Sequence, residues 1–141
     1  MQEETSFSPT PVPVAFLVCD KVIIEADSGK RTIVGVFDQV EISEFPAVCG
    51  PIWLYISVID CEGDYSNLIE YVQVSTQKVL AQANGTTTSA NRQVCVDLVL
   101  PWPQLPLPEA GEYEFRFWMN GKFISRTRVS VVSHAETEGN S

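Results

Sequence analysis

Three acidic residues gather in one short segment whose chemistry could bind a metal ion. Asp60, Glu62 and Asp64 are separated by Cys61 and Gly63, and a turn at the glycine would bring the three carboxylates together. Hard cations such as Ca²⁺ take several carboxylate oxygens as ligands. The segment lacks the spacing and the terminal glutamate of an EF-hand loop, and acidic turns are common because their residues suit turn geometry. We expect a solvated turn, and keep a calcium- or small-ligand-binding site at Asp60, Glu62 and Asp64 as the alternative.

The sequence gives little support for nucleophilic catalysis. Its one histidine, His134, falls in a polar stretch close to the last residue. A serine or cysteine nucleophile usually needs a base held within hydrogen-bond distance, which a histidine in an unstructured tail would not provide. We therefore expect no enzymatic activity and no cofactor.

The four cysteines do not form a metal-binding pattern. No two of Cys19, Cys49, Cys61 and Cys95 are two to four residues apart, which is the spacing of paired ligands in structural zinc sites. Cys19 and Cys95 lie in apolar runs, where a cysteine acts as a small apolar side chain. We expect all four to be reduced, because intracellular compartments keep thiols reduced.

Aromatic and arginine side chains are the stronger functional signal. Strand alternation places Arg116 and Trp118 on the outer face of a hairpin, and places Trp53 and Tyr55 together on one face of an earlier strand. Such residue types are enriched at protein interfaces, although the opposite sheet or a loop could also cover these faces. We expect these four residues to anchor a partner protein or a second copy of the chain. Residues 79–82 are predicted to form a short edge strand that could pair with a partner strand.

The clearest of the elements that position these residues is a hairpin near the end of the chain. Apolar and polar residues alternate over residues 111–132 on both sides of Asn120-Gly121. This dipeptide between alternating arms is a strong hairpin signal.

Two loops would give this hairpin different registers. A two-residue loop with unbroken pairing would set Phe115 opposite Arg126 and mix charge into an apolar face. A three-residue loop, with Gly121 at positive φ, instead pairs Phe117 with Phe123 and turns both inward with Tyr113 and Phe115. We therefore predict the three-residue loop. The outer face then carries three attractive pairs: Trp118 with Lys122, Glu114 with Arg126, and Glu112 with Arg128.

The rest of the chain also predicts strands and no substantial helix. A first hairpin covers residues 16–42 around a turn at 27–30, and Gly35 marks a bulge or a close backbone approach. Further strands are expected at 52–61, 68–75 and 94–100, with a polar loop at 84–91 and an unpaired, proline-rich crossover at 101–108. These features predict a two-sheet antiparallel β-sandwich of about seven to nine strands. The segment Gly111-Glu-Tyr113 is similar to a tyrosine corner, which favours an immunoglobulin- or fibronectin-like sandwich.

Length and charge limit the remaining function classes. The 141 residues, 45% of them hydrophobic, suffice for one domain, which we place at residues 14–133 between disordered segments at 1–13 and 134–141. The net charge of −9 disfavours a nucleic-acid surface, because such surfaces need clustered lysines and arginines. We see no export signal and no apolar run of about twenty residues, and so expect a cytoplasmic protein without membrane association.

Several short motifs in order resemble a known family. They are residues 15–24, Gly29-Lys30, residues 34–38, Phe45-Pro46, Gly111-x-Tyr-x-Phe115 and Asn120-Gly121. In this order and spacing they resemble a family of unknown function, made of small and mostly single-domain bacterial proteins. The resemblance implies a bacterial, non-secreted β-sandwich. It offers no catalytic or binding residues to carry over to this chain.

Overall fold

The computed structural model describes residues 8–133, which fold into strands and contain no helix. The eleven strands are β1 (Val12–Ile24), β2 (Arg31–Val36), β3 (Gln39–Ile42), β4 (Ala47–Cys49), β5 (Ile52–Ile59), β6 (Gly63–Gln73), β7 (Lys78–Ser89), β8 (Val96–Trp102), β9 (Leu105–Leu107), β10 (Gly111–Met119) and β11 (Lys122–Ser133). The all-β fold is as predicted, with more strands than the seven to nine expected. Within the described residues, the chain has no helix that could cross a membrane.

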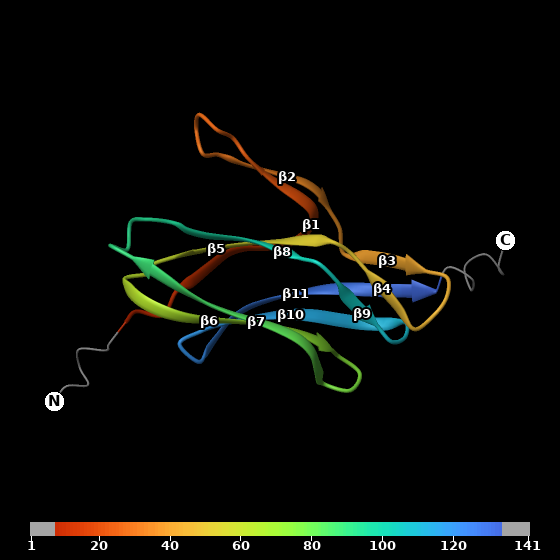
Figure 1. The fold of residues 1–141 in the computed structure, drawn as a ribbon. Helices are drawn as coiled ribbons and strands as arrows, with labels where there is room; N and C mark the ends of the chain where they lie inside the picture. Colours follow the sequence, from red (N-terminus) through yellow and green to blue (C-terminus); the bar gives the residue numbers. More distant parts are fainter. Residues whose placement is uncertain (1–7, 134–141) are drawn as a thin grey trace.

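Two main sheets carry nine of the strands (Figure 1). The four-stranded sheet has the order β2-β1-β5-β8, and the five-stranded sheet has the order β3-β11-β10-β6-β7. Strands β4 and β9 form a small third sheet. The prediction of purely antiparallel sheets was wrong, because β3 pairs with β11 in parallel. The first hairpin, predicted to cover residues 16–42, therefore ends at Val36, and residues 39–42 leave it as β3 to join the edge of the other sheet.

The core lies between the two main sheets and follows from strand alternation. On β5, the buried side chains Ile52, Leu54, Ile56 and Val58 alternate with the half-buried Trp53 and Tyr55 and with Ser57, which is buried on the other face. On β10, Tyr113, Phe115, Phe117 and Met119 are almost fully buried in the same way. The ring of Phe115 packs 5.1 Å from Tyr71 and 5.2 Å from Trp102, measured between ring centres, so aromatic contacts join β6, β8 and β10.

Tyr113 also fixes the turn before β10. Its hydroxyl donates a hydrogen bond to the backbone oxygen of Glu109 at 2.6 Å, and the backbone N–H of Glu109 donates to that hydroxyl at 3.3 Å. This pair of hydrogen bonds ties the start of β10 to backbone four residues upstream.

The register predicted for the β10–β11 hairpin was wrong. Met119 pairs with Lys122, so the loop is the two-residue Asn120-Gly121, and both residues have positive φ as a type I′ turn requires. A bulge follows on β11, where Trp118 pairs with Phe123 but Phe117 pairs with Ser125.

The bulge explains why neither simple register holds. It turns Ile124 inward, where it is 8% exposed, and leaves Phe123 outside at 48% exposure. Beyond the bulge, Tyr113 pairs with Val129 and both are buried. An extra residue thus restores the apolar face that a two-residue loop alone would break.

The first hairpin, β1–β2, forms one edge of the four-stranded sheet and extends beyond β5. Strand β1 pairs with β5 only from Val12 to Cys19, and from Cys19 to Ile24 its partner is β2 (Figure 1). On β2, Gly35 has a φ of 69°, and a Cβ added there would lie 2.2 Å from Oδ2 of Asp20 on β1. The glycine therefore allows a close approach, but by the Asp20 side chain rather than by backbone as predicted.

Three predicted irregular segments are more ordered than expected. Strand β7 continues through residues 84–89, which were expected to be a loop. Residues 101–102 belong to β8, and residues 105–107 form β9. Within the segment expected to be a disordered arm, the carbonyl of Pro9 accepts a 2.8 Å hydrogen bond from the Tyr65 hydroxyl, and β1 begins at Val12. Residues 1–7 and the predicted tail at 134–141 lie outside the described residues.

Candidate functional site

The four predicted anchor residues lie on opposite outer faces of the sandwich. Arg116 and Trp118 alternate with core residues on β10 and so point away from the core of the five-stranded sheet. Trp53 and Tyr55 do the same on β5 of the four-stranded sheet. The structure therefore brings them together as two pairs, not as one site.

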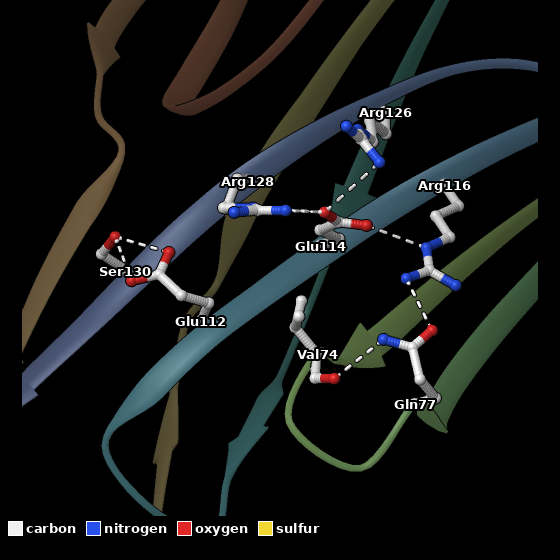
Figure 2. A network of polar contacts seen from close by, with 8 residues as sticks. All are labelled: Val74, Gln77, Glu112, Glu114, Arg116, Arg126, Arg128 and Ser130. Carbon is white, nitrogen blue, oxygen red and sulfur yellow. Dashed lines mark hydrogen bonds and ion pairs between the residues drawn. The ribbon is translucent and has the colours of Figure 1, made fainter.

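The first surface, here called the arginine face, is built around Glu114 on the five-stranded sheet. It consists of Glu114, Arg116, Trp118, Phe123, Arg126 and Arg128 from β10 and β11. The Glu114 side chain is only 1% exposed, and three guanidinium groups surround its carboxylate (Figure 2).

Two of these arginines hold Glu114 by hydrogen bonds. Nε of Arg116 donates to Oε1 at 2.9 Å, while Nε and Nη2 of Arg128 donate to Oε2 at 3.2 and 2.5 Å. Arg116 is itself held from its other side, because its Nη2 donates to Oε1 of Gln77 at 3.1 Å (Figure 2). Arg116 and Arg128 are thus fixed in direction before any partner arrives, whereas Arg126 lies 3.9 Å from the carboxylate and is not hydrogen-bonded to it.

The ionised form of Glu114 is favoured despite burial. Burial by itself raises the pKa of this carboxyl, but hydrogen bonds from Arg128 and Arg116 and their positive charges outweigh it, and the pKa falls below its ordinary value. Glu114 also compensates a strained pairing, since Arg116 lies directly opposite Arg126 across the strands. Like charges at opposite positions repel each other.

An aromatic pair borders the three arginines. The rings of Trp118 and Phe123 meet edge to face with their centres 5.4 Å apart, and Phe123 is 48% exposed. The Trp118 indole N–H donates to Oε1 of Glu70 on β6 at 3.0 Å, which fixes the ring orientation. The face therefore combines rigid aromatic surface with charged groups.

The second surface, here called the Asp97 face, lies on the four-stranded sheet beside the first hairpin. It consists of Arg31, Trp53, Tyr55, Ser57, Cys95 and Asp97. The Asp97 carboxylate accepts hydrogen bonds from the hydroxyls of Tyr55 at 3.1 Å and Ser57 at 2.9 Å, and from the Cys95 thiol at 3.5 Å. Arg31, beside the hairpin turn, places its Nε 3.8 Å from Asp97, so this ion pair joins the hairpin to β8.

Burial and the Asp97 carboxylate both disfavour ionisation of Tyr55. Burial is the larger effect, the hydrogen bond to Asp97 adds to it, and together they raise the pKa of the Tyr55 hydroxyl. Tyr55 therefore acts here as a neutral hydrogen-bond donor.

Several residues of the two faces were not singled out from the sequence. Glu114 and the arginines of β11 were expected to form exposed pairs, because alternation gives a strand face but not how deeply it is covered. The exposed position of Phe123 depends on the bulge. Asp97 was not considered, and Cys95 was expected to be apolar filling, whereas it is exposed and contacts Ser57 at 3.0 Å.

The carboxylates of the alternative metal site point to separate partners. Glu62 forms an ion pair with Arg92 at 3.6 Å, and Asp64 accepts a hydrogen bond from Thr88 at 2.8 Å. Asp60 has a positive φ of 65° at the turn. Among residues 8–133, no three acidic, histidine or cysteine side chains are arranged as a metal-binding group.

The predicted edge strand lies at a sheet edge and borders a hollow, but it is a twelve-residue strand rather than a short one. Residues 79–82 belong to β7, which is the last strand of the five-stranded sheet. Residues 81–83 and residues 101–104 line an open hollow of about 350 Å³ between β7 and the end of β8.

Comparisons with known proteins agree with the resemblance seen in the sequence. Residues 14–132 match a family of unknown function, DUF6941. No curated protein matches the chain. Because the match spans almost the whole described fold, the chain belongs to the DUF6941 family of unknown function.

Proposed function

We propose that this protein is a non-enzymatic interaction module that binds another protein through its arginine face. The observation that carries this proposal is the Trp118–Phe123 pair beside three arginines, two of which are held by hydrogen bonds to the buried Glu114. Tryptophan and arginine dominate the energetics of protein interfaces, and groups already held in place lose little entropy on binding.

The Asp97 face is the weaker candidate for a partner surface. Its hydrogen-bonding groups converge on one another, and its arginine already joins the hairpin to β8. Of the four predicted anchors, Arg116 and Trp118 therefore fit the proposal best, with Phe123 and Arg126 as additional contacts.

We also propose a relation to immunoglobulin- or fibronectin-like sandwiches. It is supported by the hydrogen bond from the Tyr113 hydroxyl to upstream backbone, which is typical of tyrosine corners in such domains. The parallel β3–β11 pair and the small β4–β9 sheet would be additions to that plan.

The test captures partners from the native host with three baits. We expect the wild-type protein to retain a partner and the double variant Phe123→Ser, Arg126→Gln to lose it. Val36→Ser is the matched control, because Val36 is also exposed but lies on the first hairpin. An identical set of proteins on all three baits would contradict the proposal.

A further inference from the structure

The arginine face concentrates positive charge in an acidic chain. Three of the five arginines lie on it, although the net charge is −9. Two further acids border these arginines, and their hydrogen bonds come from neutral donors: Glu70, directly opposite Arg116 on β6, accepts from Trp118, and Glu112 accepts from the Ser130 hydroxyl at 2.8 and 2.9 Å. Neither forms an ion pair of 4 Å or less with Arg116 or Arg126 among the described residues.

Arg126 has unused hydrogen-bonding capacity. Its side chain is 62% exposed, and its one side-chain polar contact within residues 8–133 is the ion pair with Glu114, at 3.9 Å. That distance is longer than a hydrogen bond, so the planar group of five N–H donors in Arg126 is open to an incoming acceptor. Arg128, which is 50% exposed, lies on the same strand two residues away.

The geometry between the strands favours an added negative charge. Arg116 lies opposite Arg126 on one side and opposite Glu70 on the other, and among the described residues Glu114 is the one carboxylate within 4 Å of the three guanidinium groups. A further carboxylate above Arg126 would relieve the repulsion and could accept two parallel N–H bonds. At physiological salt, charges more than about 8 Å away are largely screened, so such a ligand would respond mainly to this local cluster rather than to the net charge.

The neighbouring rings indicate a peptide rather than a free ion. Phe123 is half exposed and packs on Trp118, immediately along the strands from Arg116 and Arg126. We infer that the partner of this face is a short acidic segment of another protein, with carboxylates on Arg126 and Arg128 and an apolar residue on Phe123. This inference rests on the proposed function and adds the chemistry of the partner.

The test titrates a hexaglutamate peptide into the full-length protein at physiological salt, and follows the Arg Nε–H signals by NMR. We expect the Arg126 and Arg128 signals to shift, and hexaglutamine to leave them unchanged. Arg126→Gln should weaken hexaglutamate binding about fivefold, the value of one exposed charge pair. Arg126→Lys should recover part of this affinity, because lysine keeps the charge without the planar group.

Arg92→Gln is the matched control. Arg92 is also exposed, and it forms an ion pair with Glu62. Its replacement by glutamine changes the net charge by the same amount as Arg126→Gln. It should alter the affinity less than twofold. Equal weakening by both variants, or no shift in the wild type, would overturn the acidic-partner inference. Hexaglutamate could fail to bind while the Phe123→Ser, Arg126→Gln bait still loses its partner. That result would support the arginine face as the interaction surface and contradict only the acidic chemistry of the partner.

Discussion

The two outer faces of the sandwich each centre on a carboxylate, but different donors satisfy it. Glu114 is 1% exposed and is surrounded by three arginines, whereas the Asp97 side chain is 19% exposed and accepts from two hydroxyls and a thiol, with one arginine at 3.8 Å. On the first face, a buried acid directs cations toward solvent. On the second, the polar groups point at one another and join a hairpin to the sheet. A buried carboxylate can therefore either hold cationic side chains toward a partner or join neighbouring strands to one another.

The largest expected effect concerns the hairpin of the Asp97 face. Gly35→Ala would place a side chain at positive φ and against Asp20, and should lower the free energy of unfolding by about 1–3 kcal/mol. Gly29→Ala is the control, because Gly29 has a similar φ of 73° but open space around its Cβ position. Urea unfolding should show the larger loss for Gly35→Ala. Adding Asp20→Ala, which removes the carboxylate but leaves the Cβ of residue 20 at 3.1 Å, should reduce the difference. Equal losses in the two single variants would show that the approach of Asp20 is unimportant.

The next effect compares the two carboxylates directly. Glu114→Gln keeps the side-chain shape but removes the negative charge that accepts hydrogen bonds from Arg116 and Arg128. It should lower the free energy of unfolding by about 1–2 kcal/mol. Asp97→Asn should cost less, about 0.5–1 kcal/mol, because its closest donors are neutral. Urea unfolding measures both free energies, and the dependence of the unfolding free energy on urea concentration should be the same in the variants and the wild type. The comparison fails if Asp97→Asn is the more destabilising change.

A pH titration of stability gives an independent measure of Glu114. Its pKa is lower in the folded protein than in the unfolded chain, where a glutamate has a pKa of about 4.3, so the unfolded state takes up the proton first as the pH falls. The contribution of Glu114 is therefore complete above about pH 4.3 and is lost as the pH falls through the folded pKa. The difference in unfolding free energy between wild type and Glu114→Gln should shrink over this range. A difference that stays constant from neutral pH to the acid limit would contradict the assigned ion pairs.

An effect on stability as small as that of Asp97→Asn is expected at Phe123. Phe123→Ala removes the edge-to-face contact with Trp118 and should cost about 0.5–1 kcal/mol, because the ring is half exposed. Ile24→Ala, at an exposed position on the first hairpin, should change stability by no more than about 0.5 kcal/mol. Thermal unfolding measures both, and tryptophan fluorescence should change for Phe123→Ala alone. A loss of several kcal/mol would mean that Phe123 is a core residue.

Strand alternation predicted much of the fold but not its irregularities. It identified the inward residues of β5 and β10 because a period of two directly separates the faces of a strand. It placed the extra residue of this hairpin in the loop instead of in a bulge beside Ile124, because both arrangements turn Ser125 and Thr127 to the same face. It also missed the second half of β7, where polar contacts such as the Asn67 side chain with Thr87 replace apolar alternation.

The candidate site was predictable by residue type but not by arrangement. Arg116 and Trp118 were recognised because arginine and tryptophan on an outer strand face suggest an interface. Their separation from Trp53 and Tyr55 depends on which sheet each strand joins, and this is decided by contacts far apart in the sequence. The burial of Glu114 depends in the same way on three arginine side chains lying over it.

Photo-crosslinking from each face tests the central claim most directly. A photoreactive amino acid is placed at Phe123 on the arginine face or at Val36 on the first hairpin, both exposed, and each protein is irradiated in host lysate. We predict a discrete crosslinked protein partner from position 123, reduced when Arg126→Gln is added, and none from position 36. A partner crosslinked from position 36 but not from position 123 would contradict the assignment of the arginine face as the interaction surface.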